Sequence, residues 1–353
     1  MTDRKCRNVA DICRDMRNMS FGRVMSAMAV LVLMASSCEK KESPVTLPPV
    51  GTSQHSTVEI GENYRNQLYF DIESGQVVYT NDVTNWDLAF EASADGYHVY
   101  MNGGKNVLIA VTNDTSFSGV NSTTYNSLLY NQNDGAWKFD YPSGLPNATG
   151  VGEWKDAFGE SKKLVYIVST DSSFKKFKLS SVDDQRYVMQ YGDIDSQTPQ
   201  TIEIPKSINY NLSYFSFASS NHIVAAEPPK NTWDILFTRY RHIYTNLNNF
   251  KYIVTGVLTN PYKTTGYADS TTGYASIDMG NAGSHTFVPD HDVIGFDWKT
   301  YDYTSSTARY IVNPAKCYVL KTRKSQYWKI HFLDYYSNTG VKGTPTFEYE
   351  RMQ

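Results

Sequence analysis

The stretch Trp86-Asp87-Leu88-Ala89-Phe90 returns 147 residues later as Trp233-Asp234-Ile235-Leu236-Phe237. Self-similarity of this kind decides the architecture of a chain before any other signal does. A period near 150 residues has the size of one domain. The sequence therefore predicts two tandem domains, residues 55–200 and 201–353. Four further matches keep the same order at offsets of 144 to 153 residues: 57–60 with 201–204, 69–70 with 214–215, 98–102 with 242–246, and 176–179 with 329–332.

The composition favours β-structure in both copies. Tyr (27) and Phe (16) are frequent, and such residues suit a pleated, half-buried surface. Alternating apolar and polar residues mark strands at 163–168, 175–179 and 326–333, with Gly- and Asn-rich turns between strands. Only a short helix near 120–130 is indicated. Two loop-like inserts, 130–159 and 264–283, interrupt this frame, and long loops on a rigid frame commonly carry binding sites.

The N-terminal segment reads as an export signal. Its apolar core, 28–35, follows Arg23 and is too short to span a bilayer, which needs roughly 20 apolar residues. Ala35, Ser36 and Ser37 then precede Cys38, a pattern similar to a bacterial lipobox. The prediction is a lipoprotein signal peptide over 1–37 with lipid attached to Cys38; an ordinary secretory signal is the alternative. The Pro-rich, charged residues 38–54 are predicted to form a flexible tether.

The cysteines and the net charge limit the disulfides and the partners that are possible for the body of the protein, the residues that follow the predicted signal peptide. Cys317 is the one cysteine after Cys38, so no disulfide can form within the body. Residues 38–353 carry a net charge of −6 and no Lys/Arg-rich run, which argues against nucleic acid as a partner. The sequence also contains no Gly-x-Ser-x-Gly, no phosphate-binding Gly loop and no His-Glu-x-x-His. A non-enzymatic protein is predicted.

Trp233 to Tyr240 (WDILFTRY), followed by Thr245-Asn246, resembles the central motif of the HmuY family, haem-binding surface lipoproteins of Bacteroidetes. The runs 318–322, 327–336, 340–343 and 346–350 resemble that family's closing strands. The resemblance covers 200–353 well and 55–200 through the duplication. It implies two tandem antiparallel β domains with few short helices, and haem clasped between loops. It also implies a role in iron acquisition, in which the protein passes haem to an outer-membrane transporter. The implied location of the protein is the outer membrane, at the cell surface.

Family members ligate haem through two His or Met side chains about 30 residues apart. The second copy offers His242, with Met279 and His285 lying 37 and 43 residues further on. His98 matches His242 in the first copy, and Met101 follows it. Imidazole and thioether groups are both axial ligands of haem iron, so His242, Met279, His98 and Met101 are the candidates. Each has a structural alternative, because a strand His can fill one face and Met commonly fills core gaps.

Two further patterns have structural explanations. His285 and His291 flank the turn Pro289-Asp290, which together with Asp292 offers metal-ligating residue types, but turn chemistry explains them and no metal site is predicted. The repeated Trp-Asp is interpreted as scaffold, a buried indole followed by a capping carboxylate.

A second function class stays open beside haem binding. The body is rich in Tyr, Trp and Asn, and Trp137, Trp154 and Trp298 lie in loop-like contexts. Aromatic rings stack on sugars and dominate protein interfaces. The alternative is a non-catalytic surface lipoprotein that binds glycans or a partner protein.

Overall fold

The computed structural model describes residues 50–130, 135–170, 173–304 and 308–353. The predicted signal peptide and most of the tether lie outside these ranges. Within them the chain is mostly β, as predicted, and no helix is long and apolar enough to cross a bilayer. The helices are short: α3 (Asn126–Tyr130), α4 (Met279–Ala282) and the 3₁₀ turns η2 (Val83–Asn85), η3 (Gly103–Lys105), η4 (Pro146–Ala148), η5 (Thr245–Leu247) and η6 (Tyr274–Ser276).

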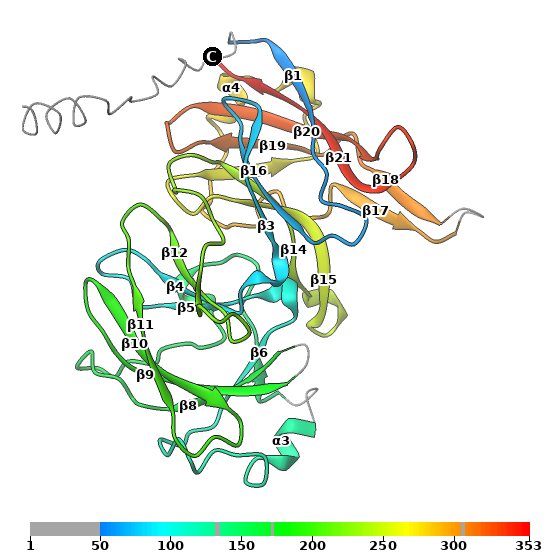
Figure 1. Cartoon of the computed structure of the whole chain (residues 1–353). Helices are drawn as coiled ribbons and strands as arrows, with labels where there is room; N and C mark the ends of the chain where they lie inside the picture. Colours follow the sequence, from blue (N-terminus) through cyan, green and yellow to red (C-terminus); the bar gives the residue numbers. More distant parts are fainter. Residues whose placement is uncertain (1–49, 131–134, 171–172, 305–307) are drawn as a thin grey trace, which may run out of the picture. The chain divides into compact units, whose positions relative to one another are not determined.

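Two antiparallel sheets form what we call the first lobe (Figure 1). The larger has the order β11-β10-β9-β8-β6-β7, with β6 (Leu108–Val111), β7 (Trp137–Lys138), β8 (Val165–Ser169), β9 (Phe174–Val182), β10 (Arg186–Asp193) and β11 (Gln200–Pro205). The smaller has the order β13-β12-β4-β5, with β4 (Leu88–Glu91), β5 (Val99–Met101), β12 (Leu212–Phe215) and β13 (Ile223–Val224).

The second lobe repeats this plan. Its five-stranded sheet has the order β1-β21-β20-β19-β16, with β1 (Ser53–Thr57), β16 (Thr265–Asp269), β19 (Cys317–Lys321), β20 (Tyr327–Tyr336) and β21 (Lys342–Arg351). Its four-stranded sheet has the order β15-β14-β2-β3, with β2 (Asn66–Asp71), β3 (Gln76–Asp82), β14 (Ile235–Tyr244) and β15 (Phe250–Thr259). A small hairpin completes it, made of β17 (Lys299–Asp302) and β18 (Arg309–Val312).

The two sequence repeats exchange their N-terminal strands. From the first repeat, β1 pairs with β21 and β2 pairs with β14, both in the second lobe. From the second repeat, β11 pairs with β10 and β12 pairs with β4, both in the first lobe. Figure 1 shows this directly, because the blue strand β1 runs beside the red strand β21. The boundary predicted at residue 200 thus separates the two sequence repeats, whereas each folded lobe combines strands of both repeats.

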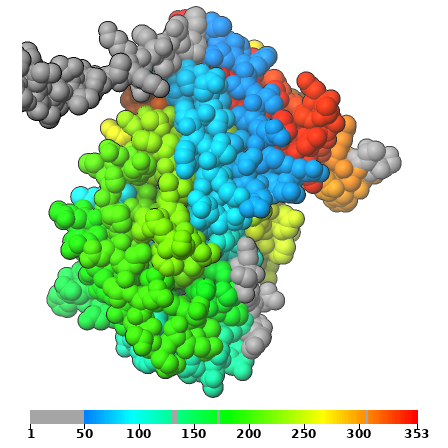
Figure 2. All heavy atoms as spheres, in the orientation of Figure 1, coloured from blue at the N-terminus to red at the C-terminus, as the bar shows by residue number. Residues whose placement is uncertain are grey.

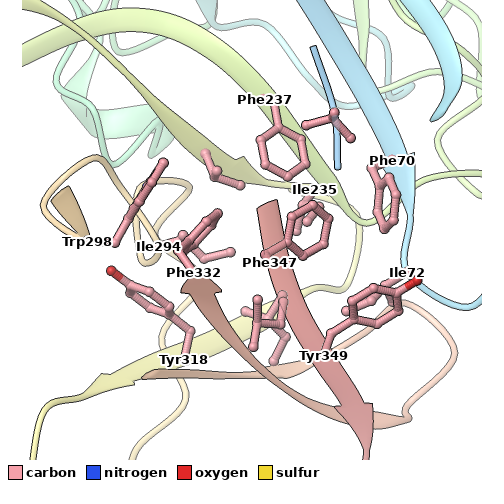
Figure 3. Close-up of a cluster of buried hydrophobic side chains, with 14 of the residues drawn as sticks. Phe70, Ile72, Ile235, Phe237, Ile294, Trp298, Tyr318, Phe332, Phe347 and Tyr349 are labelled. Carbon is pink, nitrogen blue, oxygen red and sulfur yellow. The ribbon is translucent and has the colours of Figure 1, made fainter. Parts of the chain in front are cut away.

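The hydrophobic cores follow the same exchange. Phe70 of β2 packs edge-on against Phe237 and Phe347, with ring centroids 6.2 and 5.3 Å apart, and Figure 3 shows these rings together. In the first lobe Phe215 of β12 joins a core built mainly from residues 88–191. In the face shown in Figure 2, blue N-terminal residues lie against red C-terminal ones. Each lobe therefore needs the other repeat's strands to complete its core.

The Trp-Asp motif holds each exchanged strand in place. Oδ2 of Asp234 accepts the backbone N–H of Ile72 at 3.2 Å, just beyond β2. Oδ2 of Asp87 accepts the N–H of Phe217 at 2.7 Å, just beyond β12. Both aspartates are buried, and each has a cation as partner: Arg323 for Asp234, and Lys105 for Asp87 at 2.6 Å. The two aspartates thus have the scaffold role interpreted from the sequence, whereas the indole of Trp86 is only half-buried.

We expect Asp234→Asn to lower the free energy of unfolding by about 2 kcal/mol. Removing one partner of a buried ion pair costs roughly 3–5 kcal/mol, and here Arg323 keeps Asp71, whose Oδ1 lies 2.8 Å from its Nη2. Urea unfolding measures the change. Asp183→Asn, at a surface aspartate, is the matched control and should stay within about 0.5 kcal/mol of the wild type. Equal unfolding midpoints for both variants would contradict a stabilising role for the contacts of Asp234.

Candidate functional site

A cavity of about 540 Å³ is lined by strands of both four-stranded sheets and by loops of both repeats. This volume lies in the range of roughly 300–1,000 Å³ typical of small-molecule sites. The first predicted insert contributes residues 140–142 and 144–146 to the lining, whereas the second contributes none of 264–283. In the second repeat the lining residues after β15 are Pro261, Tyr262, Pro289 and His291. The strand exchange therefore creates a ligand-sized space shared by the repeats.

Two matching aromatic pairs line this cavity. Trp86 packs edge-on against Tyr214, with ring centroids 5.1 Å apart, and Trp233 packs edge-on against Tyr69 at 4.9 Å. In each pair the Trp belongs to one repeat and the Tyr to the strand received from the other. The indole N–H of Trp86 donates to Gln67 at 3.1 Å, whereas that of Trp233 is buried without a partner. The pairs give the cavity rigid apolar walls.

A buried carboxyl group meets the two tyrosines. Tyr69 and Tyr214 share a hydrogen bond, and Tyr214 also bonds to Glu227. Glu227 accepts the backbone N–H groups of Asn211 at 2.6 Å and Leu212 at 2.9 Å. Burial nevertheless raises the pKa of Glu227 to about 7, because desolvation disfavours the charged form. Glu227, which lines the cavity, is therefore protonated at mildly acidic pH.

A second, half-buried carboxyl group ties a loop to the strand of one of the predicted ligands. Asp140 accepts the N–H of Met101 at 2.5 Å and that of Gly150 at 2.7 Å. Burial raises the pKa of Asp140 to about 7. Met101 is buried, as expected from its place in the strand, and also lines the cavity. Asp140 therefore ties the insert to the backbone of the strand that carries Met101.

His291 brings an imidazole to the same cavity. Its backbone N–H donates to the carbonyl of Ser143 at 2.9 Å. A Cβ on Gly144 would lie 2.1 Å from its Nδ1, so the turn can cover the ring only because residue 144 is glycine. Burial lowers the pKa of His291 to about 4, which keeps the ring neutral and able to ligate iron near neutral pH. The sequence had placed His291 in a turn beside Pro289-Asp290 without giving it this role.

Three of the four predicted haem ligands lie outside the cavity lining. Nδ1 of His98 bonds to Glu91 at 2.8 Å, and its ring stacks on Tyr97. His242 packs against Tyr244 and Phe296, and its pKa is lowered by burial.

Met279 begins α4 and packs in a separate cluster with Tyr267 and Ile277. Cys38 lies outside the described residues. No group of three or more His, Cys, Asp or Glu residues positioned for a metal ion occurs in the described part of the chain.

The match of His98 to His242 was wrong as a structural equivalence. Leu88 and Ile235 hold the same place in the two copies, directly after the Trp-Asp motif. Leu88 pairs with Met101 and Ile235 pairs with Thr259, so Met101 corresponds to Thr259 in the second copy. The side-chain amides confirm this register. Those of Asn102 and Asn260 donate to the carbonyls of Trp86 and Trp233, at 2.9 and 2.7 Å. The second repeat has a longer β14–β15 hairpin, and His242 lies on its extension.

The three tryptophans that suggested glycan stacking are buried. Trp137 packs under α3 with its indole N–H donating to Leu128 at 3.1 Å, and Trp154 donates to Tyr97 at 2.7 Å. Trp298 stacks on Phe332 at 3.9 Å. Burial of a large apolar ring is favourable, and none of the three has an exposed face for stacking. The expectation that these three tryptophans offer rings for stacking on sugars was wrong.

We expect Glu227→Gln to flatten the pH dependence of stability. Glutamate in the unfolded chain titrates near 4.5, whereas Glu227 in the fold titrates near 7. Between these values the folded state binds more protons than the unfolded state, so stability falls as pH rises. Chemical denaturation at about pH 5 and pH 8 should show a smaller loss for the variant, by up to about 3 kcal/mol. Glu203→Gln, at an exposed glutamate, should keep the wild-type slope, and parallel curves for all three proteins would refute the assignment.

Comparison with known proteins agrees with the duplication. The family model described as HmuY protein matches the chain twice, over residues 63–211 and 208–349, which confirms the predicted tandem copies. No curated protein matches. Among solved structures, apo PinO from Porphyromonas gingivitis is 10% identical, with 86% of this chain and 98% of that chain covered and a TM-score of 0.31.

Two other structures are similar. The apo HmuY analog TFO from Tannerella forsythia is 12% identical, with coverage of 87% and 100% and a TM-score of 0.24. A protein described as HmuY-like and heme binding, from Bacteroides vulgatus ATCC 8482, is 16% identical, with coverage of 52% and 94% and a TM-score of 0.23. Because the two matches of the family model together span residues 63–349, more than half of the chain, the chain belongs to the HmuY family.

Proposed function

We propose that the chain is a surface lipoprotein that binds haem or a related porphyrin in the cavity between its repeats. The observation that carries this proposal is that Met101 and His291 both line one ligand-sized cavity walled by Trp86 and Trp233. A thioether and a neutral imidazole are an established axial pair for haem iron. Family membership supports haem as the ligand.

The residues present fit such a group. Met101 and His291 would hold the iron, and the aromatic pairs would contact the porphyrin faces. When bound, haem would supply the iron that the protein carries. Nε2 of His98 faces Glu153 at 3.7 Å and its ring stacks on Tyr97 away from the cavity lining, which favours the cavity pair over His98. His242 and Met279 remain candidates from the sequence that the cavity does not support.

The lipid anchor and transport role belong to the same proposal. Cys38 would attach the body to the outer membrane through the tether, and an outer-membrane transporter would receive the haem. The alternative, a lipoprotein that binds glycans or a partner protein, is favoured by one observation. Phe250 and Tyr252 are more than half exposed on the β14–β15 hairpin and stack at 6.2 Å. Such a protein would leave the spectrum of haemin unchanged.

We expect purified protein titrated with haemin to develop a shifted Soret band, with and without reductant. Met101→Ala and His291→Ala should each weaken binding by about tenfold or more, since even residues supporting a metal ligand contribute that much. The matched controls are Met279→Ala and His242→Ala, which should bind like the wild type. A flat difference spectrum for the wild type would remove haem binding, whereas loss only in His242→Ala would remove the cavity assignment.

We expect Cys38→Ser to move the protein from the membrane fraction to the soluble fraction of cells. Burying acyl chains stabilises membrane attachment by about 0.8 kcal/mol per CH₂ group, and serine accepts no thioether-linked lipid. Fractionation followed by immunoblotting measures the shift. Cys317→Ala is the control, because Cys317 is buried in the fold. A membrane-bound Cys38→Ser protein would contradict lipid attachment at this position.

A further inference from the structure

Two arginines on β14, Arg239 and Arg241, line the cavity, and neither forms an ion pair with a carboxylate within the described residues. Arg239 and Arg241 alternate along the strand and therefore share a face. Arg241 is 7% exposed, and the Nε atoms of both are buried with no hydrogen-bond partner. A buried cation left without a counter-charge is unfavourable, which is why buried charges are normally paired. The two arginines are thus an exception to this rule, and a bound anion would supply the missing counter-charge.

The contacts of Arg241 do not neutralise its charge. Its Nη2 donates to the amide oxygen of Asn106, and its guanidinium lies 5.9 Å from the ring centroid of Phe139. Burial lowers the pKa of Arg241, and no acidic group counteracts that effect. Arg323, equally buried, contrasts with it by contacting both Asp71 and Asp234. Arg323 is therefore neutralised by two carboxylates, whereas Arg241 forms no ion pair among the described residues.

The surroundings of Arg241 add positive charge. The ammonium of Lys251 lies 4.3 Å from the same Phe139 ring. Burial, followed by the charges of Arg241 and Lys138, lowers the pKa of Lys251. Three acids line the cavity: Glu227 and Asp140 have raised pKa values without an arginine among the causes, and Glu91 bonds to His98. The positive charge of this wall is therefore not neutralised by an ion pair among the described residues.

We propose that Arg241 and Arg239 form an anion subsite that binds a carboxylate of the ligand. This assignment rests on the proposed function, because haem carries two propionate groups. A guanidinium presents a planar fork of donors that matches a carboxylate and gains strength where water is excluded. The subsite fixes the orientation of the porphyrin in the cavity, with its acidic edge toward β14.

The experiment compares haemin with haemin dimethyl ester, whose propionates carry no charge. The wild type should bind the free acid about tenfold or more tightly than the ester. Arg241→Gln and Arg239→Gln should lose this preference while keeping the affinity for the ester. Arg186→Gln, at a half-exposed arginine of β10, is the matched control and should keep the preference. Equal binding of acid and ester by the wild type would overturn the subsite.

Iron-free protoporphyrin IX and its dimethyl ester separate this proposal from iron ligation. Quenching of Trp86 and Trp233 fluorescence reports their binding. Preference for the acid without a Soret shift for haemin would keep the subsite and reject ligation by Met101 and His291. Binding of none of the four porphyrins would reject both proposals. If Arg241→Gln does not fold, Arg239→Gln decides alone, because Arg239 makes no side-chain hydrogen bond among the described residues.

Discussion

The interaction on which the structure depends is a buried carboxylate that accepts a backbone N–H from a strand of the other repeat. Asp87 and Asp234 each make this bond, to Phe217 and Ile72. A buried carboxylate is costly unless it is paired and hydrogen-bonded, and Lys105 and Arg323 supply the pairing cations. The bond is specific to the exchanged position, so it selects the strand partner as well as stabilising it.

The exchange decides where the cavity lies. Because β2 and β12 cross into opposite lobes, Tyr69 and Tyr214 meet through a hydrogen bond and each packs on the Trp of the other repeat. Lobe contact is close on one flank, where a Cβ on Gly104 would lie 2.4 Å from the carbonyl oxygen of Arg239. The cavity is therefore a product of the duplication. A single repeat would lack half of its walls.

The sequence indicates only part of the candidate groups of the cavity. Met101 could be named from its place on a strand, and the repeated Tyr-Phe pairs were seen without a role. His291 was hidden because its neighbours Pro289 and Asp290 are ordinary turn residues. His98 and His242 were matched because both occur in a His-aliphatic-Tyr-x-Asn run. The amide contacts of Asn102 and Asn260 show that the longer hairpin shifts the true register.

From the residues alone one can read two β-rich copies, their order, the strand faces and the Trp-Asp landmark, because alternation and local turn chemistry act over a few residues. Strand β9 (Phe174–Val182), for example, contains the predicted segment 175–179. Which copy completes each sheet could not be read, because both copies offer N-terminal strands of similar pattern. Pairing depends on long-range bonds such as that from Ile72 to Asp234. The folded chain therefore settles the exchange and, with it, the cavity and its unpaired arginines.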